Sequence, residues 1–154
     1  MAKVSEAVDV PLEPEVAWKC ASDLTRYSDW LTIHRAWRSE LPDNLAKGTR
    51  LESIVEVKGM ANRIKWTIVN FKSPESMTLD GVGVGGVKVK LIGKVRPNAT
   101  RLPDDSGSCA GSVVRLDVHL GGPALFGPIG IIVAAALRGD IRASLDRFVK
   151  VFAT

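Results

Sequence analysis

GPIGIIVAAALRGDIRASLDRFVKVF, residues 127–152, is the stretch that decides the fold. Apolar residues recur in it every three or four positions, which places them on one face of a helix. Pro128 fits the first helical position, where a missing N–H costs nothing. The apolar face consists of Ile129, Val133, Leu137, Ile141, Leu145, Phe148 and Phe152. The opposite face carries Arg138, Arg142, Asp146, Arg147 and Lys150. We therefore expect a single long C-terminal helix.

The chain before this helix alternates apolar and polar residues, a pattern that predicts strands with one buried and one solvated face. The expected strands are 3–10, 50–58, 63–68, 77–79, 87–96 and 114–120, with a further brief strand at 37–41. After the first strand we expect two short helices, one opened by Pro14 and a second around Tyr27 to Leu31, capped by Thr25. This order predicts an α+β fold in which a curved antiparallel sheet of six to seven strands surrounds the C-terminal helix.

Length and composition indicate one globular domain, residues 1–154, with a net charge of +4. The N-terminus lacks the apolar segment of a signal peptide, and no apolar run reaches the roughly 18 residues of a membrane helix. We therefore expect a cytoplasmic protein without a membrane span. Two cysteines, Cys20 and Cys109, and two histidines, His34 and His119, do not provide the spacing of a zinc site. No metal and no cofactor are expected.

Several segments, in their order along the chain, resemble the START-like or SRPBCC superfamily, which includes polyketide cyclases and aromatases, plant allergen-type binders and lipid transfer domains. The segments are Val10–Trp18, Tyr27–Trp30, Lys47–Thr49, Trp66–Ile68 and Pro74–Gly81. The resemblance covers nearly the whole chain. It implies the helix-grip fold of the START and Bet v 1-like proteins as a single domain.

A second group of segments is similar to the cyclase-like toxins of bacterial type II toxin–antitoxin pairs. These segments are Asp23–Tyr27, Trp30–His34, Val57–Met60, Gly83–Lys90 and Gly121–Gly130. This resemblance implies a growth-inhibiting protein that a small antitoxin protein neutralises. With the superfamily, it also implies binding of a small apolar molecule, lipid or polyketide-like, more than catalysis.

A sheet that curves around a helix leaves a pocket where the facing side chains are too small to meet. Small residues on the strands, with large apolar neighbours, favour such a pocket. The candidate ligand-pocket residues are Trp30, Ser53, Trp66, Met77, Gly83, Leu91, Phe126, Val133, Leu137 and Phe148. The alternative is a filled core, in which case the chain is a protein-interaction module and these residues only pack.

A polyketide cyclase or aromatase is the rival function, and it needs a polarised carbonyl and a proton shuttle. Tyr27 and His34 are the weak catalytic candidates, because both are expected near the mouth of the pocket. Arg115, Asp117 and His119 share one side of a strand and alternate with apolar residues, so we expect all three to face water. No carboxylate–histidine pair points to the interior.

Two features that suggest phosphate chemistry have simpler interpretations. The glycines of Gly81–Gly86 precede Val87–Lys90, which continues as a strand, whereas a dinucleotide-binding loop opens a helix. They therefore predict a turn. The outward side of the sheet is basic, but it lacks the exposed aromatic residues of RNA readers, so nucleic acid is not an expected partner.

Two segments of the sequence are expected to be loops. Residues 97–111 are rich in Pro, Asp, Ser and Gly, which favours a surface loop. Residues 121–130 place Leu125 and Phe126 between glycines and prolines. That second segment is interpreted as a gate to the pocket, a contact with a partner, or a cap on the core.

Overall fold

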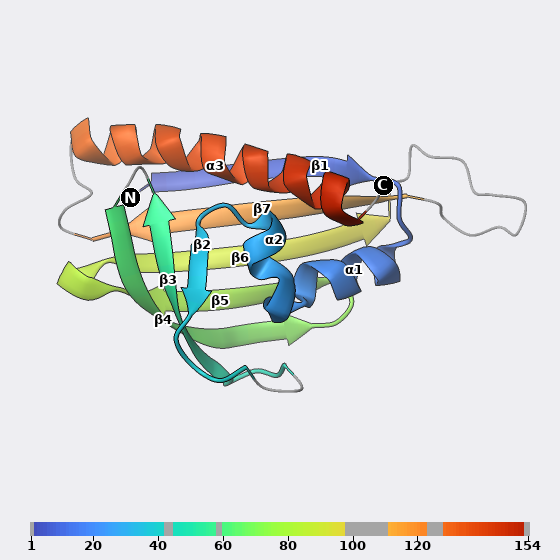
Figure 1. Cartoon of the computed structure of the whole chain (residues 1–154), viewed down its shortest axis with the longest axis horizontal. Coiled ribbons are helices and arrows are strands. Elements are labelled where there is room, and N and C mark those ends of the chain that lie inside the picture. Colours follow the sequence, from blue (N-terminus) through green and yellow to red (C-terminus); the bar gives the residue numbers. More distant parts are fainter. Residues whose placement is uncertain (1, 42–44, 58–59, 98–110, 123–127, 153–154) are drawn as a thin grey trace, which may run out of the picture.

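The computed structural model describes residues 2–41, 45–57, 60–97, 111–122 and 128–152. An antiparallel sheet of seven strands curls around one long helix (Figure 1), so the expected α+β helix-grip architecture is confirmed. The strands are β1 (Ala2–Val10), β2 (His34–Trp37), β3 (Arg50–Val57), β4 (Met60–Lys72), β5 (Ser76–Val82), β6 (Lys88–Pro97) and β7 (Ser112–Gly121). The helices are α1 (Pro14–Ser22), α2 (Tyr27–Trp30) and α3 (Pro128–Phe152), with the 3₁₀ turns η1 (Leu24–Arg26) and η2 (Val84–Gly86).

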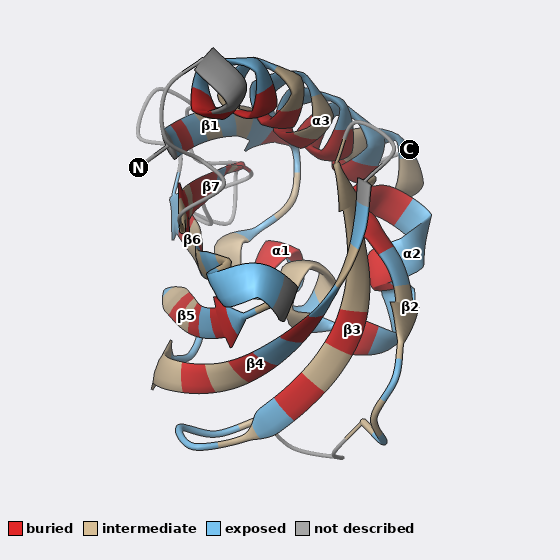
Figure 2. Ribbon diagram, turned by 90° about the vertical axis from the view of Figure 1, so that its left-hand side faces the viewer, coloured by how far each residue is buried: buried red, intermediate tan, exposed pale blue. Residues whose placement is uncertain are grey.

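The sheet has the strand order β1-β7-β6-β5-β4-β3-β2, and each neighbouring pair is antiparallel. Buried and exposed residues alternate along β5, with Met77 and Leu79 on the buried side (Figure 2). The concave face of the sheet therefore supplies one wall of the core, and the convex face meets solvent.

Helix α3 begins at Pro128 and runs for 25 residues, as the apolar period predicted. Its buried apolar side chains include Val133, Leu137, Ile141, Leu145 and Phe148. The helix lies along β1 (Figure 1), where Arg142 pairs with Glu6 at 3.5 Å. Burial of this apolar stripe, rather than intrinsic helix propensity, accounts for most of the stability of such a helix.

Two hydroxyl groups fix α3 to the chain that follows α2. The hydroxyl of Ser144 accepts a hydrogen bond from the backbone N–H of Thr32 at 2.9 Å. The hydroxyl of Thr32 in turn donates to the backbone carbonyl of Asp140 at 3.0 Å. Ser144 is fully buried. These two hydrogen bonds hold the chain that follows α2 against α3.

The cap of the second short helical segment was predicted wrongly. Arg26 precedes α2 and makes no side-chain cap bond. Asp23 caps the 3₁₀ turn η1: its carboxylate accepts from the backbone N–H of Thr25 at 3.1 Å and from the Thr25 hydroxyl at 2.6 Å. The 3₁₀ turn η1 starts at Leu24, three residues before the expected helix, so Thr25 lies inside it. Asp is preferred over Thr at N-caps, which agrees with the position of Asp23.

The brief strand expected at 37–41 was also misplaced, since β2 spans His34–Trp37. The backbone N–H of His34 bonds to the carbonyl of Leu31 at 3.0 Å, so the chain turns directly after α2. Pairing with β3 then begins at His34, opposite Val55. The position of β2 is thus set by its partner strand rather than by its own composition.

Asp117 is the exception to the solvated row expected on β7. It is only 7% exposed, whereas Arg115 is exposed and His119 is half-buried. The register places Ile92 and Ser5 on either side of it, and Arg115 donates from Nε to its carboxylate at 3.0 Å. Neighbouring side chains therefore cover this carboxylate on the convex face.

The glycine run after β5 forms a turn, as expected. Gly85 and Gly86 adopt φ of 78° and 80° in η2, in the left-handed region that favours glycine. The other two expected loops fall mainly on residues 98–110 and 123–127, which lie outside the described residues, together with Phe126 and Cys109.

Candidate functional site

Two small apolar hollows lie between the concave face of the sheet and the helices. The first, which we call the Trp30 hollow, has a volume of about 30 Å³ and is bounded by α1, α2, β5, β6 and β7. The second, the Trp66 hollow, has a volume of about 40 Å³ and is bounded by β2 to β7 and α3. Nearly all their lining side chains are apolar.

Four side chains, Tyr27, Leu31, Leu79 and Leu91, border both hollows and form the wall between them. Each hollow is comparable to the roughly 30 Å³ that a water molecule occupies in the liquid. Pockets that bind drug-sized ligands measure roughly 300–1,000 Å³. A ligand larger than a few atoms therefore has to displace this wall and join the two hollows.

The indole N–H groups that border the Trp66 hollow are paired within the protein. Trp66 donates from its indole Nε1 to the hydroxyl of Ser53 at 2.8 Å, and both residues are buried. The indole ring lies against Gly81, where a Cβ would sit 2.8 Å from ring carbon Cε3. Trp37 donates from its Nε1 to the carbonyl of Leu24 at 2.7 Å. Both indole N–H groups on this side are therefore satisfied, and the Trp66 ring is tightly packed against Gly81.

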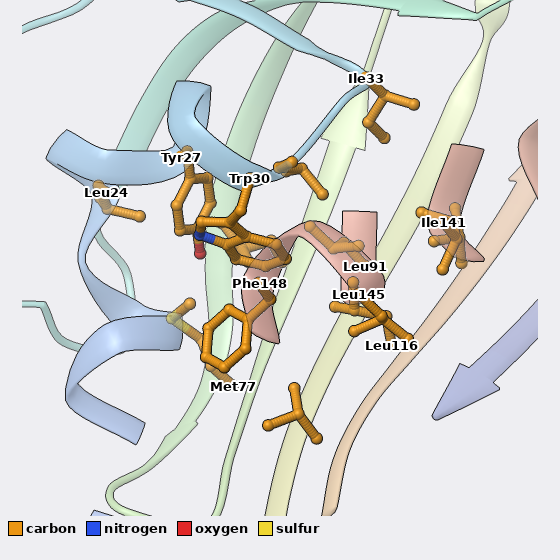
Figure 3. Packing of buried hydrophobic residues seen from close by; sticks show 14 of the residues in the cluster. Leu24, Tyr27, Trp30, Ile33, Met77, Leu91, Leu116, Ile141, Leu145 and Phe148 are labelled. Carbon is orange, nitrogen blue, oxygen red and sulfur yellow. The ribbon is translucent and has the colours of Figure 1, made fainter. Parts of the chain in front are cut away.

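Trp30, on the other side, is 2% exposed, and its indole Nε1 has no hydrogen-bond partner among the described residues. Its ring packs edge-on against Phe148 with centroids 5.1 Å apart, and against Tyr27 at 5.6 Å. Figure 3 shows the indole between these two rings. An unpaired buried donor costs about 1–3 kcal/mol in the folded state.

Tyr27 and His34, the catalytic candidates, are both buried, with ring centroids 6.1 Å apart. Burial, reinforced by the negative charge of Asp23, raises the pKa of Tyr27 far above its ordinary value, so the phenol stays protonated and can donate. Burial lowers the pKa of His34, which favours the neutral ring. Within the described residues, no hydrogen bond joins either side chain to the other or to a carboxylate.

The structure distributes the candidate pocket residues unequally. Trp30 and Met77 border the Trp30 hollow; Ser53, Trp66 and Leu137 border the Trp66 hollow; Leu91 borders both. Val133 and Phe148 are buried in the core and do not border either hollow. Gly83 directly follows β5 and borders neither hollow; a Cβ there would lie 2.7 Å from Ile64 Cδ1. Phe126 lies outside the described residues.

Sequence reasoning missed Leu31 and Leu79 as pocket residues, although they form half of the dividing wall. The sequence contains a spacing signal for each of these two residues. Leu31 follows Tyr27 by four residues, the spacing of one helical face, and Leu79 follows Met77 by two, the spacing of one strand face. Leu31 was placed in the second short helix and Leu79 in the strand at 77–79, and neither was assigned to the pocket.

The described residues hold no cluster of three or more His, Cys, Asp or Glu side chains that could bind a metal ion. None of the described helices is long and apolar enough to cross a membrane. On the convex face, basic residues pair with acidic ones: Arg63 with Glu52 at 2.8 Å, and Lys90 with Asp80 at 4.0 Å. Exposed pairs of this kind contribute little to stability, and they fit a solvated surface.

Comparison with known proteins agrees with this architecture. The START superfamily protein of Mycobacterium smegmatis aligns with a TM-score of 0.70 at 16% identity, covering 97% of this chain and 98% of that one. The protein TTHA0849 of Thermus thermophilus aligns with a TM-score of 0.73 at 14% identity, covering 96% and 94%. These likenesses concern the fold.

Similarity in sequence is higher with proteins of Mycobacterium tuberculosis. Two, named Toxin MT0934 and Toxin Rv0910, are each 67% identical over 153 residues, covering 99% of both chains. Another, named Uncharacterized protein Rv1546, is 37% identical over 152 residues with the same coverage. The family model described as polyketide cyclase / dehydrase and lipid transport matches residues 1–153. The chain therefore belongs to this polyketide cyclase/dehydrase and lipid-transport family, within the START-like superfamily.

Proposed function

We propose that this chain is a cytoplasmic toxin of a type II toxin–antitoxin pair, which a small antitoxin protein neutralises. The observation that carries the proposal is 67% identity, along 99% of both chains, to two Mycobacterium tuberculosis proteins named toxins. At that identity the interior and surface residues of the two proteins are largely shared, so a shared activity is the simplest expectation.

The proposal includes a small apolar ligand, lipid or polyketide-like, bound between the sheet and α3. The apolar lining of the two hollows supports this, because binding there would remove apolar ligand surface from water. Tyr27 and His34 are not hydrogen-bonded to each other or to a carboxylate among the described residues, which favours binding over cyclisation. Ligand entry would move the wall formed by Leu31 and Leu79.

Controlled expression in a mycobacterial host tests the toxin role. Induction should arrest growth, and co-expression of the small protein encoded next to the gene should restore it. A variant of an exposed residue, Lys88→Ala, should arrest growth as the wild type does, while Phe148→Ala, which removes a fully buried ring, should weaken toxicity because it destabilises the fold. Normal growth with abundant folded protein would contradict the role.

A protein-interaction module with a filled interior is the second candidate, and the small volume of the hollows favours it. Native mass spectrometry of the protein purified from its own host separates the two. A small-molecule mass that is lost on denaturation supports the ligand binder. A clean apoprotein mass, with the antitoxin still captured, supports the interaction module.

A further inference from the structure

The indole N–H of Trp30 is an exception in this interior. Two other tryptophans donate to protein acceptors, Trp66 to Ser53 at 2.8 Å and Trp37 to the carbonyl of Leu24 at 2.7 Å. Trp30 is more buried than either, yet its Nε1 has no partner within the part of the chain that the structure describes. Buried donors without partners are rare in folded proteins, and each one calls for a specific explanation.

Among the described residues, no side chain around the Trp30 hollow accepts the Trp30 N–H, although the hydroxyls of Tyr27 and Ser22 keep acceptor lone pairs. Tyr27 carries a protonated hydroxyl, and its ring lies beside the Trp30 indole (Figure 3). The hydroxyl of Ser22 already donates to the carbonyl of Trp18 at 2.7 Å. Lys94 also borders the hollow, but its positive charge acts on Asp117, on the convex face. The site therefore favours a neutral group that accepts a hydrogen bond.

The size of the hollow fits one such atom. About 30 Å³ accommodates a single oxygen, while the rest of the lining is apolar. We propose that the Trp30 indole donates a hydrogen bond to the carbonyl oxygen of a small, neutral and otherwise apolar ligand, whose apolar part displaces Leu31 and Leu79. This inference rests on the proposed ligand binding and names its polar anchor.

A pair of probes of matched shape tests it: acetophenone, which carries a carbonyl, and α-methylstyrene, in which a methylene group replaces the oxygen. The wild-type protein should bind acetophenone about fivefold to tenfold more tightly than α-methylstyrene, because one hydrogen bond contributes about that much to the affinity. In isotope-labelled protein, the indole N–H resonance of Trp30 should shift with acetophenone and not with α-methylstyrene. The resonances of Trp37 and Trp66 should respond equally to both probes, because their N–H groups are already paired.

Trp30→Phe keeps an aromatic ring and removes the donor, so it should abolish the preference for the ketone. Trp37→Phe is the matched control: it removes a paired indole N–H and should leave the preference intact. An unfolding transition measured on both variants establishes that they fold. If Trp30→Phe does not fold, the probe pair and the Trp30 resonance of the wild type still decide the question.

The outcomes separate this inference from the function on which it rests. Equal affinity for the two probes, with no specific shift at Trp30, overturns the hydrogen-bonded anchor and leaves apolar ligand binding in place. No binding of either probe overturns both. A preference for the ketone that survives in Trp30→Phe assigns the donor to another residue and also overturns the inference.

Discussion

Trp66 and Trp30 are buried indoles in the same interior, on opposite sides of the wall formed by Tyr27, Leu31, Leu79 and Leu91. Trp66 has its N–H paired by Ser53, and its ring lies against a glycine. Trp30 has its N–H unpaired among the described residues. The difference indicates that one side serves the stability of the fold, and that the other keeps a polar group for recognition.

The glycines on the two sides show the same contrast. A Cβ at Gly81 would lie 2.6 Å from Ile64 Cγ2 and 2.8 Å from Trp66 Cε3. A Cβ at Gly93, which borders the Trp30 hollow, would meet only Leu116 Cδ2, at 3.9 Å. The space next to Gly81 therefore has no room for a methyl group, while the space next to Gly93 has.

Phe148→Ala should have the largest effect, because it removes the ring that supports Trp30. Phe148 is fully buried and stacks edge-on with Trp30. Loss of a buried Phe side chain costs about 3–5 kcal/mol of unfolding free energy, measurable by denaturant titration. Arg147→Ala, on the exposed side of α3, should change it by less than about 0.5 kcal/mol. A small loss in Phe148→Ala would show that α3 does not fix Trp30.

Gly81→Ala against Gly93→Ala tests the packing contrast directly. Gly81→Ala should lower the free energy of unfolding by about 1–3 kcal/mol, because Ile64 and Trp66 have to shift. Gly93→Ala should leave it unchanged or raise it by about 0.4–1 kcal/mol, since alanine restricts the unfolded chain. Equal effects of the two substitutions would remove the distinction between the two sides.

The elements of this fold were predictable where the signal is local. The apolar period of 129–152 predicted α3, and alternation at 87–96 predicted β6, because side-chain direction follows directly from backbone repeat. The start of β2 at His34 was not predictable from its own residues, since pairing with Val55 sets it. The burial of Asp117 likewise depends on neighbours supplied by other strands.

The candidate site shows the same limit more sharply. Ser53 and Trp66 could both be assigned to a pocket from their strands. The pairing of the Ser53 hydroxyl with the Trp66 indole depends on the register of β3 against β4. Nothing in the sequence distinguishes the N–H of Trp30 from that of Trp66, because whether a donor is paired depends on tertiary contacts.

Ser53→Ala would make Trp66 resemble Trp30. The change leaves the Trp66 N–H buried without its acceptor, and we expect a loss of about 1–2 kcal/mol, within the range for an orphaned donor. Ser39→Ala is a matched control that removes the acceptor of a more exposed bond, to the backbone N–H of Glu52, and it should cost less. Equal stability of Ser53→Ala and the wild type would mean that the pairing at Trp66 does not stabilise the fold.

The smallest expected effect is a pH dependence that belongs to the Trp66 side. His34 borders that hollow, and burial lowers its pKa from the ordinary 6.5. The unfolded chain therefore binds more protons than the folded one below that pH, so stability is complete above about pH 6.5 and falls as the pH decreases through it. Between about pH 7.5 and about pH 5.5, the free energy of unfolding should fall less in His34→Phe than in the wild type and in His119→Gln. A wild-type slope that persists unchanged in His34→Phe would assign the dependence to other groups. If His34 is responsible, acid should also shift the indole resonance of Trp37 before that of Trp30, because the Trp37 ring centroid lies 4.7 Å from the imidazole. Such an order would show that the two sides of the interior respond separately.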